Sequence, residues 1–241
     1  MLVYSHSEVS GHVTPQGHPE RVARLRAVEA GLTGLAVERR DCPIGLREDV
    51  LRCHPAAYHD RLLAAVPTEG WVQLDGDTFL APGSYRAAMR AVGGIGAAVD
   101  AVVADGGAAF VAGRPPGHHA ETARPMGFCL FGTVAIGAKR ALDLHGLGRV
   151  AVVDFDVHHG NGTQDLLWDE ARCLFASSQQ MPLFPGSGRP EEKGAHGQVL
   201  NVPLRGGTDG AAMRAAYERL ILPAVADWKP DTRCCKPSAA M

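Results

Sequence analysis

The sequence predicts an α/β fold built around a mostly parallel sheet, and three segments carry that prediction. Two short apolar runs, Ala108–Ala112 and Val150–Phe155, have the length and composition of strands. Between them lie a glycine- and proline-rich loop and a helical stretch over about Val134–Leu144. Because parallel neighbours need a long crossover, usually helical and right-handed, this β-loop-α-β unit predicts two parallel strands.

The other elements are expected in order along the chain. Pro19 occupies a plausible first helical position, and apolar residues at helical spacing follow it as far as Leu32. Pro55 opens a short helix, and a longer helix over residues 84–104 ends at two glycines. Strands at 173–177 and, more weakly, 199–202 precede a last helix at about 211–226.

The stretch after this last helix does not have the pattern of a strand. Where one more strand is expected, the chain continues after Pro230-Asp231 as TRCCKPSAAM. The sequence shows no internal repeat and no low-complexity linker. We therefore predict a single domain over residues 1–231, with an incomplete sheet, and an aberrant or disordered tail over residues 232–241.

The composition limits the classes of function. Hydrophobic content of 46%, charged content of 21% and a net charge of −2 are typical of a globular protein and favour no nucleic-acid surface. The six cysteines form no CxxC pair, which indicates reduced thiols. The first residues lack the layout of a signal peptide, and no apolar run has the length of a membrane span. We expect a cytoplasmic protein without a membrane partner, and the oligomeric state stays open.

Polar side chains cluster after both predicted strands. His118 and His119 follow the first strand, and Asp154, Asp156 and His158 recur at every second residue around the end of the next. Residues at period two share one face of an extended chain, so this row should project together. Since ligands bind outside the carboxyl ends of parallel strands, the two clusters should meet at one rim of the sheet.

An aspartate and an imidazole that project together can form half of a catalytic zinc site, which takes three protein ligands. Asp154 lies deeper and needs a partner, either a histidine whose tautomer it holds or a monovalent cation. Each motif has a simpler interpretation, because an isolated Asp-x-His is usually a cap or a surface pair. Six further histidines show no partner pattern and are expected at the surface or at caps: His6, His12, His54, His59, His145 and His196.

The ordered set of motifs resembles the zinc-dependent histone deacetylase family. The segments that carry the resemblance are GHPERVARLRAV, CHPAAYHDRL, RPPGHHA, GFC, VAVVDFDVHHGNGTQ and PLFPGSG. They are most similar to its bacterial class II-like branch, near the acetylpolyamine amidohydrolases, from about residue 1 to residue 231. The resemblance implies a three-layer α/β/α fold with a mostly parallel central sheet, as in arginases and deacetylases.

The resemblance also implies a role for individual residues. Asp156 and His158 would be two of three zinc ligands. His118 and His119 would activate the metal-bound water and protonate the leaving amine. Asp154 would pair with His118. The implied supporting residues are Asn161 beside His119, Ser177 with Asp154 at a potassium ion, Phe128 and Gly127 at the acyl-amine channel, Asp77 at its rim, and Arg24 at an internal cavity for acetate.

Three departures from the family pattern affect the functional prediction. Gly132-Thr133 stands where the family usually has two asparagines, and Gln179 stands near a usual histidine. The family's segment after "PD" is a strand that ends in the third zinc ligand, and a later loop carries a Tyr or His that stabilises the tetrahedral intermediate. Neither feature is expected in TRCCKPSAAM, so the resemblance implies a C-terminally truncated site.

The resulting hypothesis is a zinc-dependent amidohydrolase that removes acetyl or other acyl groups from lysine side chains or small amines. Because its third ligand is not expected in the chain, it is predicted to bind zinc weakly and to be impaired. An alternative is a non-catalytic protein that binds acyl-amines. A weaker one is a urea or guanidine hydrolase of similar architecture. Fe²⁺ could occupy the same ligands as Zn²⁺.

Overall fold

A computed structural model describes residues 1–236 and places most of the strands in two parallel sheets. Their orders are β2-β1-β5 and β8-β7-β6-β9, and a separate antiparallel pair is formed by β3 and β4. The prediction that β5 and β6 are neighbouring parallel strands is wrong, because β5 pairs with β1 whereas β6 pairs with β7 and β9. The strands are β1 Leu2–Ser5, β2 Glu38–Asp41, β3 Val72–Gln73, β4 Phe79–Leu80, β5 Ala109–Val111, β6 Val150–Asp154, β7 Cys173–Gln180, β8 Val199–Leu204 and β9 Thr232–Lys236.

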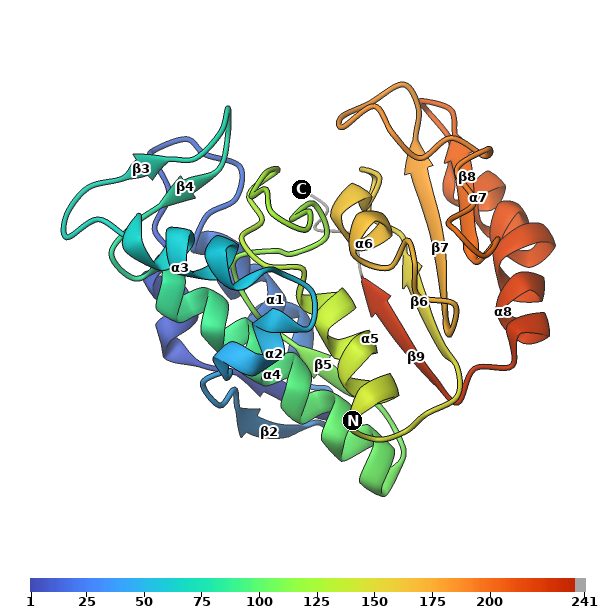
Figure 1. The fold of residues 1–241 in the computed structure, drawn as a ribbon, viewed down its shortest axis with the longest axis horizontal. Coiled ribbons are helices and arrows are strands. Elements are labelled where there is room, and N and C mark those ends of the chain that lie inside the picture. The colour runs from blue at the N-terminus through green and yellow to red at the C-terminus, as the bar shows by residue number, and fades with distance from the viewer. Residues whose placement is uncertain (237–241) are drawn as a thin grey trace.

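Helices lie on both faces of the four-stranded sheet, which confirms the predicted α/β class (Figure 1). The helices are α1 Ala23–Leu32, α2 Arg47–Leu51, α3 Ala56–Ala64, α4 Ser84–Asp105, α5 Thr133–Asp143, α6 Asn161–Leu166, α7 Gly210–Ala216 and α8 Leu222–Trp228. A 3-10 helix, η1 Ser7–Gly11, follows β1, and a π-helical turn, η2 Tyr217–Ile221, joins α7 to α8.

Strand β6 is an inner strand of this four-stranded sheet, between β7 and β9. Its two faces pack against different helical layers. All five of its residues are buried, as expected for a parallel strand covered on both sides. Val152 belongs to a core that includes Ile136 of α5, whereas Val153 packs in a second core with Ile221 and Val225 from the α7–α8 layer. The alternation of side chains along β6 therefore separates the two cores.

Helix α4 has the predicted extent and packs in the interior. By length and composition it could cross a membrane, but 56% of its most apolar window is buried inside the protein, as in a core helix. Gly93 permits the close approach of a neighbouring loop, because a Cβ there would lie 2.1 Å from the carbonyl oxygen of Pro43. The helix also contacts β5 and α5, so it lies across the first sheet and beside the helix that covers β6.

The expectation that no strand follows Asp231 is wrong. Strand β9 pairs in parallel with β6, from Val150 opposite Thr232 onward. The Asp231 carboxylate accepts hydrogen bonds from the backbone N–H groups of Gly148 and Arg149, which aligns the starts of the two strands. Cys234 packs against the main core, so one face of this short edge strand carries the apolar side chain that stabilises it. The rest of the predicted tail, residues 237–241, lies outside the described residues.

Candidate active site

The structure brings together the two polar clusters that the sequence placed after different strands. His118 lies in the loop after β5, and Asp154 is the last residue of β6. The His118 Nδ1 atom lies 2.9 Å from Asp154 Oδ2, and both side chains are buried. The predicted meeting of the two clusters at one rim is therefore observed. Because the carboxylate can only accept, His118 carries its proton on Nδ1 and presents Nε2 as an acceptor.

His119 is held in the same tautomer by a neutral partner. Its Nδ1 atom lies 2.7 Å from Asn161 Oδ1, and the Asn161 amide nitrogen donates to Glu121 Oε1 at 2.8 Å. The Glu121 contact orients the amide, so Asn161 must accept from His119. Burial, with a contribution from the adjacent His118, lowers the pKa of His119 to about 2. The two imidazoles, whose ring centres are 3.9 Å apart, thus differ in the partner at Nδ1, a carboxylate for His118 and an amide for His119.

The row of alternate polar residues continues beyond the strand as a tight turn. Asp154 Oδ1 accepts the backbone N–H of Asp156 at 3.0 Å, and Asp156 Oδ1 accepts that of His158 at 3.0 Å. The Asp156 carboxylate also lies 3.3 Å from His158 Nδ1. Side-chain to backbone hydrogen bonds two residues apart are typical of Asx turns. These bonds, rather than a β-ladder, hold the segment that follows β6.

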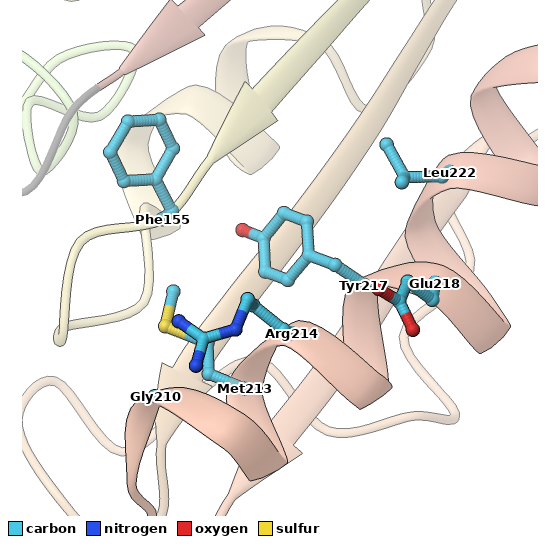
Figure 2. Close-up of a pocket in the computed structure, with 7 residues that line it drawn as sticks. All are labelled: Phe155, Gly210, Met213, Arg214, Tyr217, Glu218 and Leu222. Atoms are coloured by element: carbon cyan, nitrogen blue, oxygen red, sulfur yellow. The ribbon is translucent and has the colours of Figure 1, made fainter.

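Phe155, between the two aspartates, lines a pocket with a volume of about 340 Å³. Figure 2 shows its ring near the helices that follow β8. The pocket is lined mainly by apolar side chains: Phe155, Gly210, Met213, Arg214, Tyr217, Glu218 and Leu222. None of these lining residues is a histidine or an aspartate of the candidate site.

The residues present do not complete a zinc site. Asp156 and His158 lie together, but among residues 1–236 no three His, Cys, Asp or Glu side chains are arranged to hold a metal ion. Residues 237–241, PSAAM, contain none of these residue types. A catalytic zinc ion takes three protein ligands, so two fall short. Ser177, opposite Asp154 on β7, has a buried hydroxyl without a hydrogen-bond partner among the described residues, which suits the expected cation contact.

Two residues of the predicted channel have a backbone that the site requires. Gly127 has φ of +53°, and a Cβ there would lie 2.4 Å from the His119 ring, so glycine is needed on both grounds. Phe128 has φ of +70°, which is uncommon for an aromatic residue, and its N–H donates to Thr78 Oγ1 at 3.0 Å. The ring of His18 contacts Phe128 edge-on at 4.9 Å.

Phe184 forms the other aromatic contact of the histidine cluster. Its ring meets His119 at 5.1 Å and His158 at 6.1 Å between centres, in edge-to-face geometry. It is 43% exposed, so one side of the ring is open to solvent. The motif PLFPGSG contains this residue, but no spacing rule connects it with the histidines. Only the fold brings the loop after β7 to them.

Asp77 and Arg24 occupy more peripheral positions. The Asp77 carbonyl lies 2.9 Å from His18 Nε2, which places the residue near Phe128, and burial with the adjacent Asp75 raises its carboxyl pKa. Arg24 is half-buried near the start of α1. Asp77 therefore lies beside the His18–Phe128 contact, while its position at a channel rim and the acetate-cavity role of Arg24 stay predictions.

A buried ion pair near the tandem histidines was missed at the sequence level. Arg114, four residues before His118, contacts both Glu20 carboxylate oxygens at 2.5 Å, and both side chains are almost fully buried. His12, expected at the surface or at a cap, is buried at the C-cap of the 3-10 helix η1 and bonds to Ser84 at 2.7 Å. His54 and His59 are buried away from such caps, so the expected surface or cap position is wrong for these two histidines.

The sequence and the fold of the chain were compared with those of known proteins. Residues 18–235 match the family model described as the histone deacetylase domain. The chain belongs to the histone deacetylase family. Its structure superposes on the HDA15 HD domain with a TM-score of 0.93 at 28% identity, over 98% of this chain and 73% of that one. An acetylpolyamine aminohydrolase from Burkholderia pseudomallei, at 24% identity and a TM-score of 0.87, shares the fold over 98% of this chain and 81% of that one.

Related deacetylase-family sequences are longer than this chain. An uncharacterized protein of Synechocystis is 40% identical over 95% of this chain and 77% of its own length. A histone deacetylase-like amidohydrolase of Pseudomonas aeruginosa is 39% identical over 92% of this chain and 61% of its own. Histone deacetylase 14, chloroplastic, of Arabidopsis thaliana is 35% identical over 95% of this chain. The match spans 60% of that plant protein.

Proposed function

We propose that this deacetylase-family domain acts on acylated amines and hydrolyses the amide to a free amine and an acid. The substrate would be an acetyl-lysine side chain or a small acylated amine such as a polyamine. One observation carries the proposal: two adjacent buried histidines are each fixed at Nδ1, by Asp154 and by Asn161. With Nδ1 engaged, Nε2 is on each ring the atom left to act as a general base, which takes a proton from water.

The difference between their partners supports a division of roles between the two histidines. The Asp154 carboxylate stabilises a positive charge on His118 after proton uptake, whereas His119 has a neutral amide partner and a pKa lowered to about 2 by burial and by His118. His118 is therefore the base for the attacking water, and His119 stays neutral. General base catalysis of this kind contributes typically about 10²–10⁴-fold in rate. The proton on His118 can then pass to the amine nitrogen as the amide bond breaks.

Zinc dependence is part of the same proposal, with Asp156 and His158 as ligands and Asp154 with Ser177 at a potassium ion. Because the ligand set falls short of three, a protein consisting of these 241 residues is expected to bind Zn²⁺ weakly.

The incomplete ligand set favours one second candidate, a protein that binds an acyl-amine without cleaving it. The positions of two aromatic rings beside the site, Phe128 and Phe184, do not depend on a third metal ligand. The same holds for the positions of the tandem histidines. A cytoplasmic location, without a membrane or nucleic-acid partner, stays a prediction of the sequence.

Calorimetric Zn²⁺ titration and assays with an acetyl-lysine peptide and acetylspermidine separate these possibilities. We expect weak zinc binding that is lost in Asp156→Asn, and peptide binding by NMR that is reduced in His118→Ala. His145→Gln is the control, because His145 pairs with Asp100 away from the site. Tight stoichiometric zinc with turnover would show that the ligand set is complete. Failure to bind either compound, with or without Zn²⁺, would exclude both functions.

A further inference from the structure

The loop between β7 and β8 contains Phe184. A buried polar network that includes His159 contacts this loop. The His159 side chain is 1% exposed and follows the candidate ligand His158 directly in the chain. Its Nδ1 atom lies 2.8 Å from Ser187 Oγ, and its Nε2 atom lies 3.2 Å from Gln164 Oε1. Ser187 is three residues beyond Phe184 in this loop.

The hydrogen-bond directions in the network are determined by its members. Gln164 Nε2 donates to the Glu192 carboxylate at 2.6 Å, and Asn201 donates to Gln164 Oε1 at 2.8 Å. Gln164 Oε1 is therefore the acceptor that faces His159, and His159 carries its proton on Nε2. Nδ1 is then an acceptor, so the Ser187 hydroxyl donates to it. Replacement of Ser187 by alanine would remove this hydroxyl and leave Nδ1 of the buried His159 imidazole without a hydrogen-bond donor.

A second set of contacts fixes the residue after Ser187. Gln179 Nε2 donates to the Gly188 carbonyl at 2.6 Å, and the Gly188 N–H donates to the Glu192 carboxylate at 3.1 Å. Gly188 has φ of +90°, and a Cβ there would lie 2.6 Å from both Gln179 and the His159 ring. The loop backbone thus rests directly on the imidazole, held at neighbouring residues by Ser187 and Gln179.

We propose that His159 is a positioning residue that, through Ser187 and with Gln179 at Gly188, holds Phe184 against the rings of His119 and His158. Phe184 itself is 43% exposed, so its own burial does not fix it, and the buried clamp is the stronger constraint. The consequence for ligand binding rests on the proposed function, because Phe184 would then form one wall for the acyl-amine chain. The placement of the ring does not depend on that function.

The test uses the whole chain labelled with 4-fluorophenylalanine, which reports on all 7 phenylalanines. Phe184→Leu assigns the Phe184 signal. Ser187→Ala is expected to shift or broaden that signal, and Ser187→Thr, which keeps the hydroxyl, to retain it. Ser178→Ala is the matched control, because it removes a buried hydroxyl that bonds to Tyr217 at 2.9 Å on the other side of the sheet.

The result that overturns the proposal is an unchanged Phe184 signal in Ser187→Ala while the melting temperature falls as it does in Ser178→Ala. If Ser187→Ala does not fold, Gln179→Met tests the same clamp from Gly188. Affinity for an acetyl-lysine peptide is expected to fall by about fivefold in Ser187→Ala, the scale of one aromatic contact. If the parent chain binds no peptide, the proposed function fails, and the fluorine signal still decides the role of the clamp.

Discussion

The buried imidazole of His54 allows a direct test of the hydrogen bonds that the structure gives to its buried polar groups. Its Nε2 atom accepts the Gly132 N–H at 2.9 Å, its Nδ1 atom lies 3.1 Å from the Thr122 carbonyl, and the side chain is 1% exposed. This pairing requires the neutral imidazole. Burial lowers the pKa of His54 from its ordinary value near 6.5 to about 4. His54 thus ties the loop before α5 to the segment after the tandem histidines.

The lowered pKa determines the sign and size of the pH effect. The unfolded chain takes up a proton at His54 below pH 6.5, whereas the folded chain does so only near pH 4, so acid favours unfolding. The stabilisation is complete above pH 6.5 and is lost as the pH falls to 4. A shift of that size corresponds to about 3 kcal/mol in total, of which about 2 kcal/mol is lost by pH 5.

Urea unfolding at pH 7 and at pH 5 measures this difference. His54→Gln keeps an acceptor for Gly132 but cannot titrate, so it should lose about 2 kcal/mol less than the parent between the two pH values. Val50→Ala is the control, because it opens a cavity in the same core without removing an imidazole, and its pH dependence should match the parent. Equal pH dependence in the parent and in His54→Gln would refute the reasoning.

Two further predictions concern close packing and buried charge. Gly162→Ala should destabilise the fold by about 1–3 kcal/mol in urea unfolding, because its Cβ would lie 2.3 Å from the Ala120 carbonyl oxygen. The matched variant Gly31→Ala, in a helix with open space around it, should stabilise the fold by about 0.5–1 kcal/mol; equal losses would contradict the packing argument. Arg114→Met should cost about 3–5 kcal/mol because it leaves Glu20 charged and buried, and adding Glu20→Leu should restore most of this. A double variant no more stable than Arg114→Met would contradict the second prediction.

The parts of the fold and site that could be predicted are those with a local signal. The run from Val150 to His158 combines a buried strand with polar residues at its end, and the structure confirms the strand as far as Asp154 and joins Asp156 to it by a side-chain hydrogen bond. Strand β9 was missed because its sequence mixes Arg233 with two cysteines and a lysine. Its stability comes from pairing with β6 and from the Asp231 contacts, neither of which a local pattern contains.

The sequence by itself determined which residue types follow which strands, and hence that His118 and His119 would share a rim with Asp154. That result needs only the alternation of side chains and the common direction of parallel strands. The family resemblance also implied Asp154 as the partner of His118 and Asn161 as the partner of His119, but only the tertiary structure decided the contacting atoms: a carboxylate oxygen 36 residues away for His118 and an amide oxygen 42 residues away for His119. Such contacts depend on the packing of distant elements, because hydrogen-bond geometry is set by position in space and not by distance along the chain.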